Sequence, residues 1–281
     1  MINADFLAEL RRFSLIVNKR VTSKYSGERK SHFAGNGTIF KDHRMYTLGD
    51  NYKAIDWRVY ARTDDMYIKI FEEERNLDVH IILDSSNSMH HRGKFDYAGK
   101  IAIGMAYLAM KNNEKVHFAS FSHKVEPFRG KKGMKQIISM MEHFNSLKSS
   151  GQTDIAASMQ EYSSYLRTKS LIVIVSDFLY PNETLRKAMN FVRRGHKVKL
   201  IQVLDEEEVE MPLTGDFKLI DSESKVVLRT YVSKRMQEQY KERLSTHTNE
   251  LRQIAAIRGF NFYSFSTEKP LFDSFFELTT S

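Results

Sequence analysis

The sequence contains no cysteine. This absence excludes disulfide bonds, zinc–thiolate sites, iron–sulfur clusters and a cysteine nucleophile, so any metal site must use oxygen ligands or histidine. The sequence also lacks the Walker A pattern of a phosphate-binding loop. We therefore expect no ATP binding or hydrolysis through such a loop.

Long apolar runs are missing as well. No stretch approaches the roughly 20 consecutive apolar residues that a membrane-spanning helix needs. Residues 1–17 mix charged with apolar side chains, which is not the basic-then-apolar order of a signal peptide. The sequence therefore predicts no membrane span and a cytoplasmic location.

Basic residues are in moderate excess, since 43 Lys and Arg stand against 35 Asp and Glu, a formal net charge of +8. Such a charge suits nucleic acid, an anionic membrane surface or an acidic protein partner. The basic residues are spread along the chain in short clusters such as 19–20 and 131–132. Without a basic patch or a binding motif, the charge is weak support for nucleic acid, and we expect an acidic protein partner instead.

From residue 78 onward, short apolar runs alternate with helical patterns. The runs at 79–83, 116–121, 171–175, 198–203 and 260–265 predict strands, and most of them are apolar enough to be buried on both faces. Apolar residues at three-to-four spacing predict helices at 95–111, 132–147, 153–167, 182–194 and 231–257. Residues 125–128 are expected to form an edge hairpin with 116–121. The fold class is therefore expected to be α/β, with a doubly wound, mainly parallel sheet.

The chain is expected to have two parts. Residues 78–281 form the main domain, with an acidic inserted loop near 205–228 that ends in a small hairpin. Residues 1–77 form an amphipathic helix and an irregular arm packed on that domain. Charged residues of the arm, among them Arg44, Asp50 and Asp56, are expected to make ion pairs that fasten it. Trp57, the sole tryptophan, is expected to pack in the core of the arm.

Oxygen-bearing side chains follow the first strand of the main domain, where residues 84–88 read Asp-Ser-Ser-Asn-Ser. One carboxylate and two hydroxyls at alternate positions can converge beyond the carboxyl end of the strand, which is the chemistry that Mg²⁺, Mn²⁺ or Ca²⁺ prefers. Thr153 opens a predicted helix and Asp177 follows a predicted strand. In an open α/β sheet, ligands bind beyond the carboxyl ends of the strands, where both residues are expected.

Asp84, Ser86, Ser88, Thr153 and Asp177 resemble, in order and spacing, the metal-ion-dependent adhesion site of von Willebrand factor A domains. The resemblance implies that the Asp-x-Ser-x-Ser triplet holds a Mg²⁺-like ion. It also implies that Thr153 ligates directly or through water and that Asp177 ligates mostly through water. An acidic side chain of a partner would complete the coordination shell, and Asn87, His90 and Asp154 would lie beside it.

Motifs in the arm make the resemblance more specific. The motifs that carry it are Phe33-x-Gly35-x-Gly37, Phe40-Lys41-Asp42-His43-Arg44-x-Tyr46, Gly49-Asp50, Ile55-Asp56-Trp57, Ala61-Arg62 and Phe71-Glu72-Glu73-Glu74-Arg75. They are similar to the signature of domain-of-unknown-function family fifty-eight, and the likeness spans about residues 27–177. Members are bacterial or archaeal proteins, commonly encoded beside MoxR-type AAA+ ATPases and thought to act with them as chaperone-like modules. Many carry membrane helices ahead of the arm, so this chain would be a soluble version.

Three alternatives stand beside this interpretation. Asp and Ser after a strand are also common helix caps, so the Asp84 triplet alone is a weak signal. A haloacid-dehalogenase-type phosphohydrolase would need a second Asp as general acid two residues after the first, where this chain has Ser86. A basic nucleic-acid-binding protein would not need the triplet. We therefore expect a non-enzymatic, metal-dependent protein-binding module that works with a MoxR-type ATPase or an acidic client.

Overall fold

The computed structural model describes residues 2, 5–14, 34–35, 39–72, 77–128, 135–147, 153–192, 195–220 and 227–280. Its contacts divide the chain into two compact units. The larger contains residues Met1–Ser14 and Leu77–Ser281, and the smaller contains Leu15–Asn76. The N-terminal helix, expected to belong with the arm, is part of the larger unit. The packing of the arm on the main domain stays a prediction.

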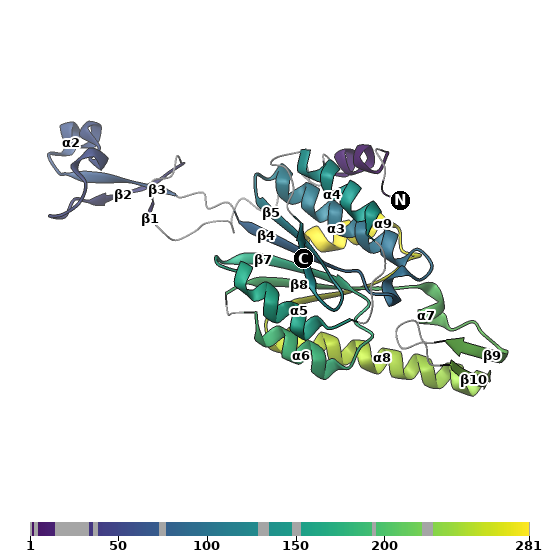
Figure 1. Ribbon diagram of the computed structural model, residues 1–281. Helices are drawn as coiled ribbons and strands as arrows, with labels where there is room; N and C mark the ends of the chain where they lie inside the picture. Colours follow the sequence, from purple (N-terminus) through teal and green to yellow (C-terminus); the bar gives the residue numbers. More distant parts are fainter. Residues whose placement is uncertain are drawn as a thin grey trace. The chain divides into compact units, whose positions relative to one another are not determined.

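A six-stranded sheet forms the centre of the larger unit (Figure 1). Its strands are β4 (Asp78–Asp84), β5 (Lys115–Phe121), β6 (Val125–Phe128), β7 (Ser170–Ser176), β8 (Lys197–Leu204) and β11 (Asn261–Ser266). They lie in the order β11-β8-β7-β4-β5-β6. Neighbours are parallel except β5 and β6, which form the expected antiparallel edge hairpin. The expected doubly wound, mainly parallel sheet is confirmed.

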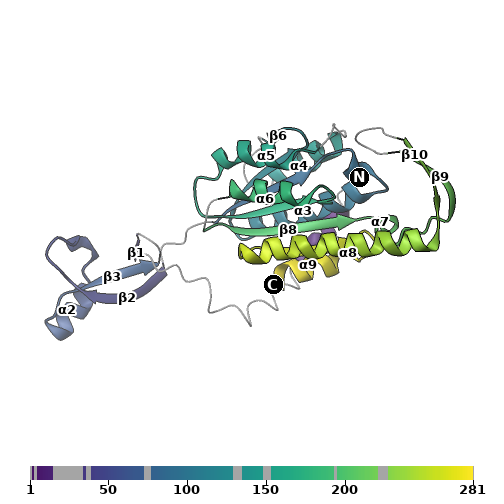
Figure 2. The same cartoon turned by 90° about the horizontal axis from the view of Figure 1, so that it is seen from below.

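Helices cover both faces of this sheet. In Figure 1, α3 (Lys94–Lys111), α4 (Lys135–Ser146) and α9 (Leu271–Thr280) lie on one face. On the other lie α5 (Ile155–Tyr162), α6 (Asn182–Asn190) and α8 (Lys234–Ile257), the last in the foreground of Figure 2. The central strands β4 and β7 are buried on both sides, which explains why they are almost continuous apolar runs.

The N-terminal helix, residues 5–14, belongs to the layer of α3, α4 and α9. The Phe13 ring lies 5.8 Å from that of Phe275 on α9. Ahead of the helix, the backbone of Ile2 exchanges two hydrogen bonds with the side-chain amide of Asn145 on α4. The apolar side of the expected amphipathic helix is therefore buried against the main domain.

The region 205–228 was expected to be an inserted loop that ends in a small hairpin, and its described residues include such a hairpin and a short helix that was not expected. It contains α7 (Glu206–Glu210) and strand β9 (Gly215–Ile220), which pairs with β10 (Val227–Val232). Asp205 starts α7 with a capping box, in which its side chain and that of Glu208 satisfy each other's backbone amides. Because β10 extends to Val232, α8 begins at Lys234 and not at the expected residue 231.

The smaller unit is built on a three-stranded sheet in the order β1-β3-β2, comprising β1 (Ala34–Gly35), β2 (Ile39–Met45) and β3 (Tyr67–Glu72). It also holds a 3-10 turn, η1 (Tyr52–Ala54), and helix α2 (Trp57–Thr63), whose first turn is capped by Asp56. Arg44 makes a bidentate ion pair with Asp50 inside this unit. Trp57 is 58% exposed, so its expected core role is wrong.

Among the described residues, no helix combines the length and the apolar character needed to cross a membrane.

Candidate metal centre

Asp84 ends β4 and is completely buried. Its Oδ1 accepts a hydrogen bond of 2.9 Å from the backbone N–H of Ser86, and its Oδ2 accepts one of 2.7 Å from the Ser176 hydroxyl of β7. The first bond turns the following loop back over the strand end. The second ties the carboxylate to the neighbouring strand, so its position is fixed from two sides.

The two serines of the triplet lie together in this loop. The Ser86 and Ser88 hydroxyls are 3.0 Å apart, and Ser86 is fully buried. A short 3-10 turn, η2 (Ser88–His90), follows directly. The structure therefore brings the carboxylate of Asp84 and both hydroxyls to one point at the carboxyl end of β4.

Asp177 lies one residue beyond β7, the strand beside β4, and is 2% exposed. Burial, together with the negative charge of Asp177, raises the pKa of Asp84 to about 7. Two carboxylates that influence each other in this way are close neighbours. A cation beside them would offset both the burial of the Asp84 charge and its repulsion by Asp177.

Thr153 is placed at the same edge by the backbone around it. The N–H of Asp154 donates to the carbonyl of Ser122, just beyond β5 on the other side of β4, at 2.9 Å. Thr153 is half-buried there, directly before α5. The helix starts two residues later than expected, with Asp154 as its cap and not Thr153.

Lys94, which no sequence motif marks, is the main addition to the site. It is the first residue of α3, it is fully buried, and its Nζ donates to Asp177 Oδ2 at 2.9 Å and to Glu208 Oε1 at 2.6 Å. Burial alone lowers the pKa of Lys94, but the charges of Asp177 and Glu208 outweigh it and the net shift is upward. The chain thus supplies one permanent positive charge beside Asp177.

Tyr180 is a second residue that the sequence did not reveal. Its hydroxyl is buried, and burial followed by the charges of Asp84 and Asp177 raises the pKa of Tyr180 well above its ordinary value. A neutral phenol therefore stands near both carboxylates. No local motif marks it, because its proximity depends on the turn that follows β7.

The residues expected beside the ion have structural contacts of their own. His90 Nδ1 lies 3.1 Å from the Ser86 carbonyl oxygen, and its ring stacks on Phe95 at 4.1 Å. The side chain of Asp154 is exposed and accepts a hydrogen bond from the Ala157 N–H, which caps α5. Asn87 is half-buried within the loop. A role for these three residues in partner binding stays a prediction.

The donor set fits a hard divalent cation. Asp84, Ser86 and Ser88 offer oxygen alone, and Asp177 and Thr153 stand on the flanking segments. Oxygen donors select Mg²⁺, Mn²⁺ or Ca²⁺ over metals that favour nitrogen or sulfur. Lys94 already neutralises Asp177, whereas the hydrogen bonds described for Asp84 come from neutral donors, so Asp84 is the carboxylate with more to gain from a bound cation.

Comparison with known proteins identifies the family to which the chain belongs. A family model described as "Protein of unknown function DUF58" matches residues 42–250. The chain belongs to the DUF58 family. In this DUF58 protein, the resemblance seen in the sequence motifs spans about residues 27–177. The family model begins later, at residue 42, and continues past Asp177 into α8. The family named from the sequence motifs is confirmed.

The DUF58 protein is also similar to an uncharacterised protein and to solved structures. The uncharacterised protein Rv1480 of Mycobacterium tuberculosis is 24% identical over 260 residues, which are 90% of this chain and 81% of that protein. Among solved structures, the conserved hypothetical protein BatB from Bacteroides thetaiotaomicron is 16% identical with a TM-score of 0.44, covering 73% of this chain and 100% of its own. A von Willebrand factor type A protein from Catenulispora acidiphila is 12% identical with a TM-score of 0.46, covering 76% of this chain and 43% of that chain.

Proposed function

We propose that this DUF58 protein is a non-enzymatic protein-binding module that grips an acidic side chain of a partner through a divalent cation. The observation that carries this proposal is the convergence of Asp84, Ser86 and Ser88 at the carboxyl end of β4, with Asp177 directly after the adjoining strand. One directly bonded carboxylate leaves a Mg²⁺ ion with a net positive charge and open coordination positions. A carboxylate from a partner would occupy an open coordination position and offset the remaining positive charge.

Two features support binding without turnover. Ser86, at the position where a phosphohydrolase of the haloacid-dehalogenase type needs an acid, is buried and paired with the Ser88 hydroxyl. A serine hydroxyl cannot supply the proton that a leaving group requires at neutral pH. Lys94, the buried cation beside Asp177, is held by two carboxylates. These contacts support ion binding over proton transfer by Ser86 or Lys94.

The partner is proposed to be a MoxR-type AAA+ ATPase or an acidic client that such an ATPase remodels. The support is the family resemblance of the arm together with the net charge of +8, which attracts acidic surfaces. Family membership alone is consistent with a protein-interaction module.

Calorimetric titration of Mg²⁺ and Mn²⁺ tests the metal step. Wild type is expected to bind one ion, Asp84→Ala to lose binding by at least about a hundredfold, and Asp216→Ala to behave like wild type. Asp216 is an exposed carboxylate on β9, so its variant removes the same charge without touching the site. Equal affinity of wild type and Asp84→Ala would remove the metal site from the proposal.

Binding to a purified MoxR-type ATPase tests the partner step. Because the ATPase itself needs Mg²⁺ for nucleotide, the comparison is between Asp84→Ala and Asp216→Ala in the same buffer, not between buffers with and without a chelator. Wild type and Asp216→Ala are expected to capture the ATPase and Asp84→Ala to release it. Equal capture of the ATPase by all three proteins would overturn the proposed function. So would steeply salt-dependent binding to an oligonucleotide, if Asp84→Ala binds it as well as wild type does. Hydrolysis of p-nitrophenyl phosphate would overturn it too.

A further inference from the structure

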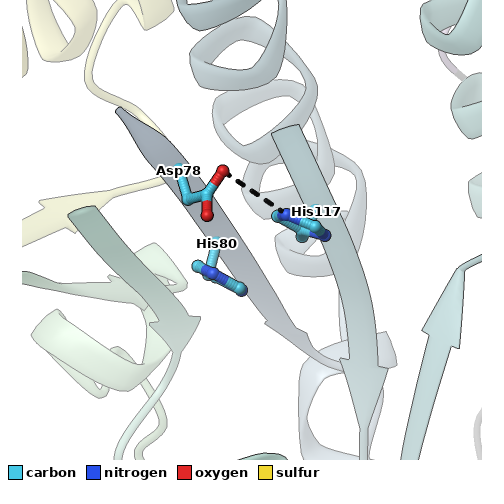
Figure 3. A group of neighbouring side chains, drawn as sticks. All are labelled: Asp78, His80 and His117. Carbon is cyan, nitrogen blue, oxygen red and sulfur yellow. Dashed lines mark ion pairs between the residues drawn. The ribbon is translucent and has the colours of Figure 1, made fainter. Parts of the chain in front are cut away.

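A second group of metal-binding side chains lies at the opposite edge of the sheet, where β4 and β5 begin (Figure 3). Asp78 and His80 are two residues apart on β4 and so point to the same face. The parallel register pairs His80 with His117 of β5. The backbone therefore places one carboxylate and two imidazoles side by side.

Distances confirm the cluster. One candidate ligand atom from each of the three residues lies within 4.8 Å of the other two. The imidazole rings of His80 and His117 stack with centroids 4.5 Å apart and an interplanar angle of 9°, and His117 Nε2 is 3.9 Å from Asp78 Oδ1. Figure 3 shows the Asp78 carboxylate beside the His117 ring, with His80 next to both.

Outer contacts hold two of the three side chains in place. His80 is 1% exposed, and its Nδ1 lies 2.9 Å from the Tyr162 hydroxyl. When Nδ1–H donates to Tyr162, the lone pair of Nε2 is left for a metal, which is the usual arrangement of a ligating histidine. Thr168 donates to Asp78 Oδ2 at 2.6 Å. The Asp78 carboxylate and the His80 imidazole are therefore each oriented by a hydrogen bond of their own.

We propose that Asp78, His80 and His117 bind a divalent transition metal, with Zn²⁺ as the ion that suits them best. Two imidazoles and one carboxylate are a common zinc ligand set, and they leave a fourth position for water or for another ligand. Mg²⁺ disfavours imidazole, so the two ends of β4 would select different ions. This site does not depend on the proposed function of the Asp84 site.

The ligands must close in around the ion, and the His117 ring must turn out of its stack on His80, because the lone pairs of two parallel imidazoles cannot both point at one ion. In a tetrahedral zinc site with bonds of about 2.0–2.2 Å, ligand atoms are roughly 3.4 Å apart. The side chains of His117 and Asp78 are 38% and 20% exposed, so both can move toward the buried His80. Burial, followed by the charges of neighbouring groups, lowers the pKa of His80 to about 4, so its ring is neutral at pH 7 and in the form that binds metals. Lys115, whose charge also lowers the pKa of both histidines, opposes the bound ion.

Titration of Zn²⁺ into tag-free, metal-depleted protein, with Mg²⁺ in large excess to fill the other site, tests the proposal. Wild type is expected to bind one Zn²⁺, and His117→Asn and Asp78→Asn are expected to bind it at least about tenfold more weakly. Both variants alter partly exposed side chains, and far-ultraviolet circular dichroism verifies their folding. His80 is left unchanged because its replacement would disturb the core.

His91→Asn is the matched control, because His91 is exposed and follows the Asp84 loop, where adventitious zinc would bind. Its zinc affinity is expected to equal that of wild type. Replacing Zn²⁺ by Co²⁺ gives a second measurement, since an intense visible absorption band that is lost in His117→Asn reports imidazole ligation in a tetrahedral site. No zinc binding by wild type, or unchanged binding by His117→Asn, would overturn the proposal, as would loss of binding in His91→Asn alone.

Discussion

Protons and Mg²⁺ compete for the carboxylate of Asp84. Burial and the charge of Asp177 raise the pKa of Asp84 to about 7, so below that pH a proton must leave before a cation binds. We expect the affinity for Mg²⁺ to fall about tenfold per pH unit below about pH 7 and to level off above about pH 8. Calorimetry at several pH values, in two buffers with different ionisation enthalpies, measures both the affinity and the protons released. Affinity that is constant across this range would contradict the prediction.

The same raised pKa affects folding of the metal-free protein. The pKa of Asp84 is higher in the folded state than its ordinary value of 3.8, so between about pH 4 and 7 the folded state holds a proton that the unfolded state has lost. The contribution of this group to the free energy of unfolding therefore decreases as the pH rises through that interval. Asp84→Asn, which cannot titrate, should show a flatter pH dependence in urea melts. An identical pH dependence in both proteins would exclude Asp84 as the cause.

Lys94 offers another test at the scale of one residue. Replacing it by methionine leaves the carboxylates of Asp177 and Glu208 without their buried cation. We expect Lys94→Met to lower the free energy of unfolding by about 3–5 kcal/mol without metal, and Mg²⁺ to restore more stability than it adds to wild type. Thermal melts with and without Mg²⁺ measure both effects.

The matched control is Lys100→Met in the same helix. Lys100 makes a partly exposed ion pair with Asp96 one turn away, which is worth about 1 kcal/mol or less. A loss of stability in Lys94→Met no larger than that in Lys100→Met would show that the buried pair is not needed.

The difference between Asp84 and Lys94 shows which part of the site a sequence can reveal. Asp84, Ser86 and Ser88 lie within five positions at the end of one strand, so local spacing was enough to predict their convergence. Lys94 meets Asp177 and Glu208 across 83 and 114 residues of sequence. A lysine on the buried side of an amphipathic helix has no local signal that names its partners.

At the scale of elements, α3 packs closely on its neighbours through two glycines. A Cβ atom on Gly104 would lie 2.0 Å from Cζ of Phe275, and one on Gly99 would lie 2.1 Å from Cζ of Phe144. Both rings are buried and enclosed, so they cannot move aside without disturbing α9 and α4. The absence of side chains at these two positions therefore sets the distance between the helices.

Gly104→Ala is expected to destabilise the protein despite the better helix propensity of alanine. Overpacking against Phe275 should lower the free energy of unfolding by about 1–3 kcal/mol net of the roughly 1 kcal/mol that alanine contributes within a helix. Urea denaturation measures the change. Lys100→Ala, on the partly exposed side of α3, is the control and should change stability by about 0.5 kcal/mol or less. A more stable Gly104→Ala would contradict this account of the packing.

Elements were predictable where burial imposes a pattern. Strands β4, β5, β7, β8 and β11 lie within one or two residues of their expected bounds, because burial keeps β4, β5, β7 and β8 largely apolar and makes alternate residues of the edge strand β11 apolar. Helix ends depend on caps that compete locally, so α5 and α8 begin at other residues than expected. The acidic composition of 205–228 concealed α7, which is stabilised by its capping box and by ion pairs from Arg92 and Lys94. Trp57 was misjudged because aromatic residues are usually buried.

At the scale of the whole molecule, the smaller unit is an insertion in the larger one. The chain leaves the larger unit after Ser14 and re-enters it at Leu77. The Ser14 hydroxyl accepts a hydrogen bond from Lys111 at the end of α3, and the Leu77 carbonyl accepts one from the backbone of Lys115 at the start of β5. Only a short turn separates Lys111 from Lys115, so the exit and re-entry points lie near each other. Domains are commonly inserted between such neighbouring points.

This arrangement predicts that the larger unit folds without residues 15–76. A flexible Gly/Ser linker of about 12 residues, with a root-mean-square span of roughly 19 Å, should join Ser14 to Leu77 without strain. We expect the shortened protein to unfold cooperatively and to bind Mg²⁺ with the affinity of the full chain, because the oxygen donors of the Asp84 site all lie within the larger unit. Thermal melts and calorimetry measure these properties.

Circular dichroism and the ATPase capture assay then separate two roles of residues 15–76. Folding and metal binding that persist while ATPase capture is lost would assign partner recognition to the inserted unit, which carries most of the family signature. Retention of all three properties would assign recognition to the metal edge of the larger sheet. A shortened protein that fails to fold, even with the linker doubled in length, would show that the larger unit depends on the insertion for its stability, contrary to the separation of contacts between the two units.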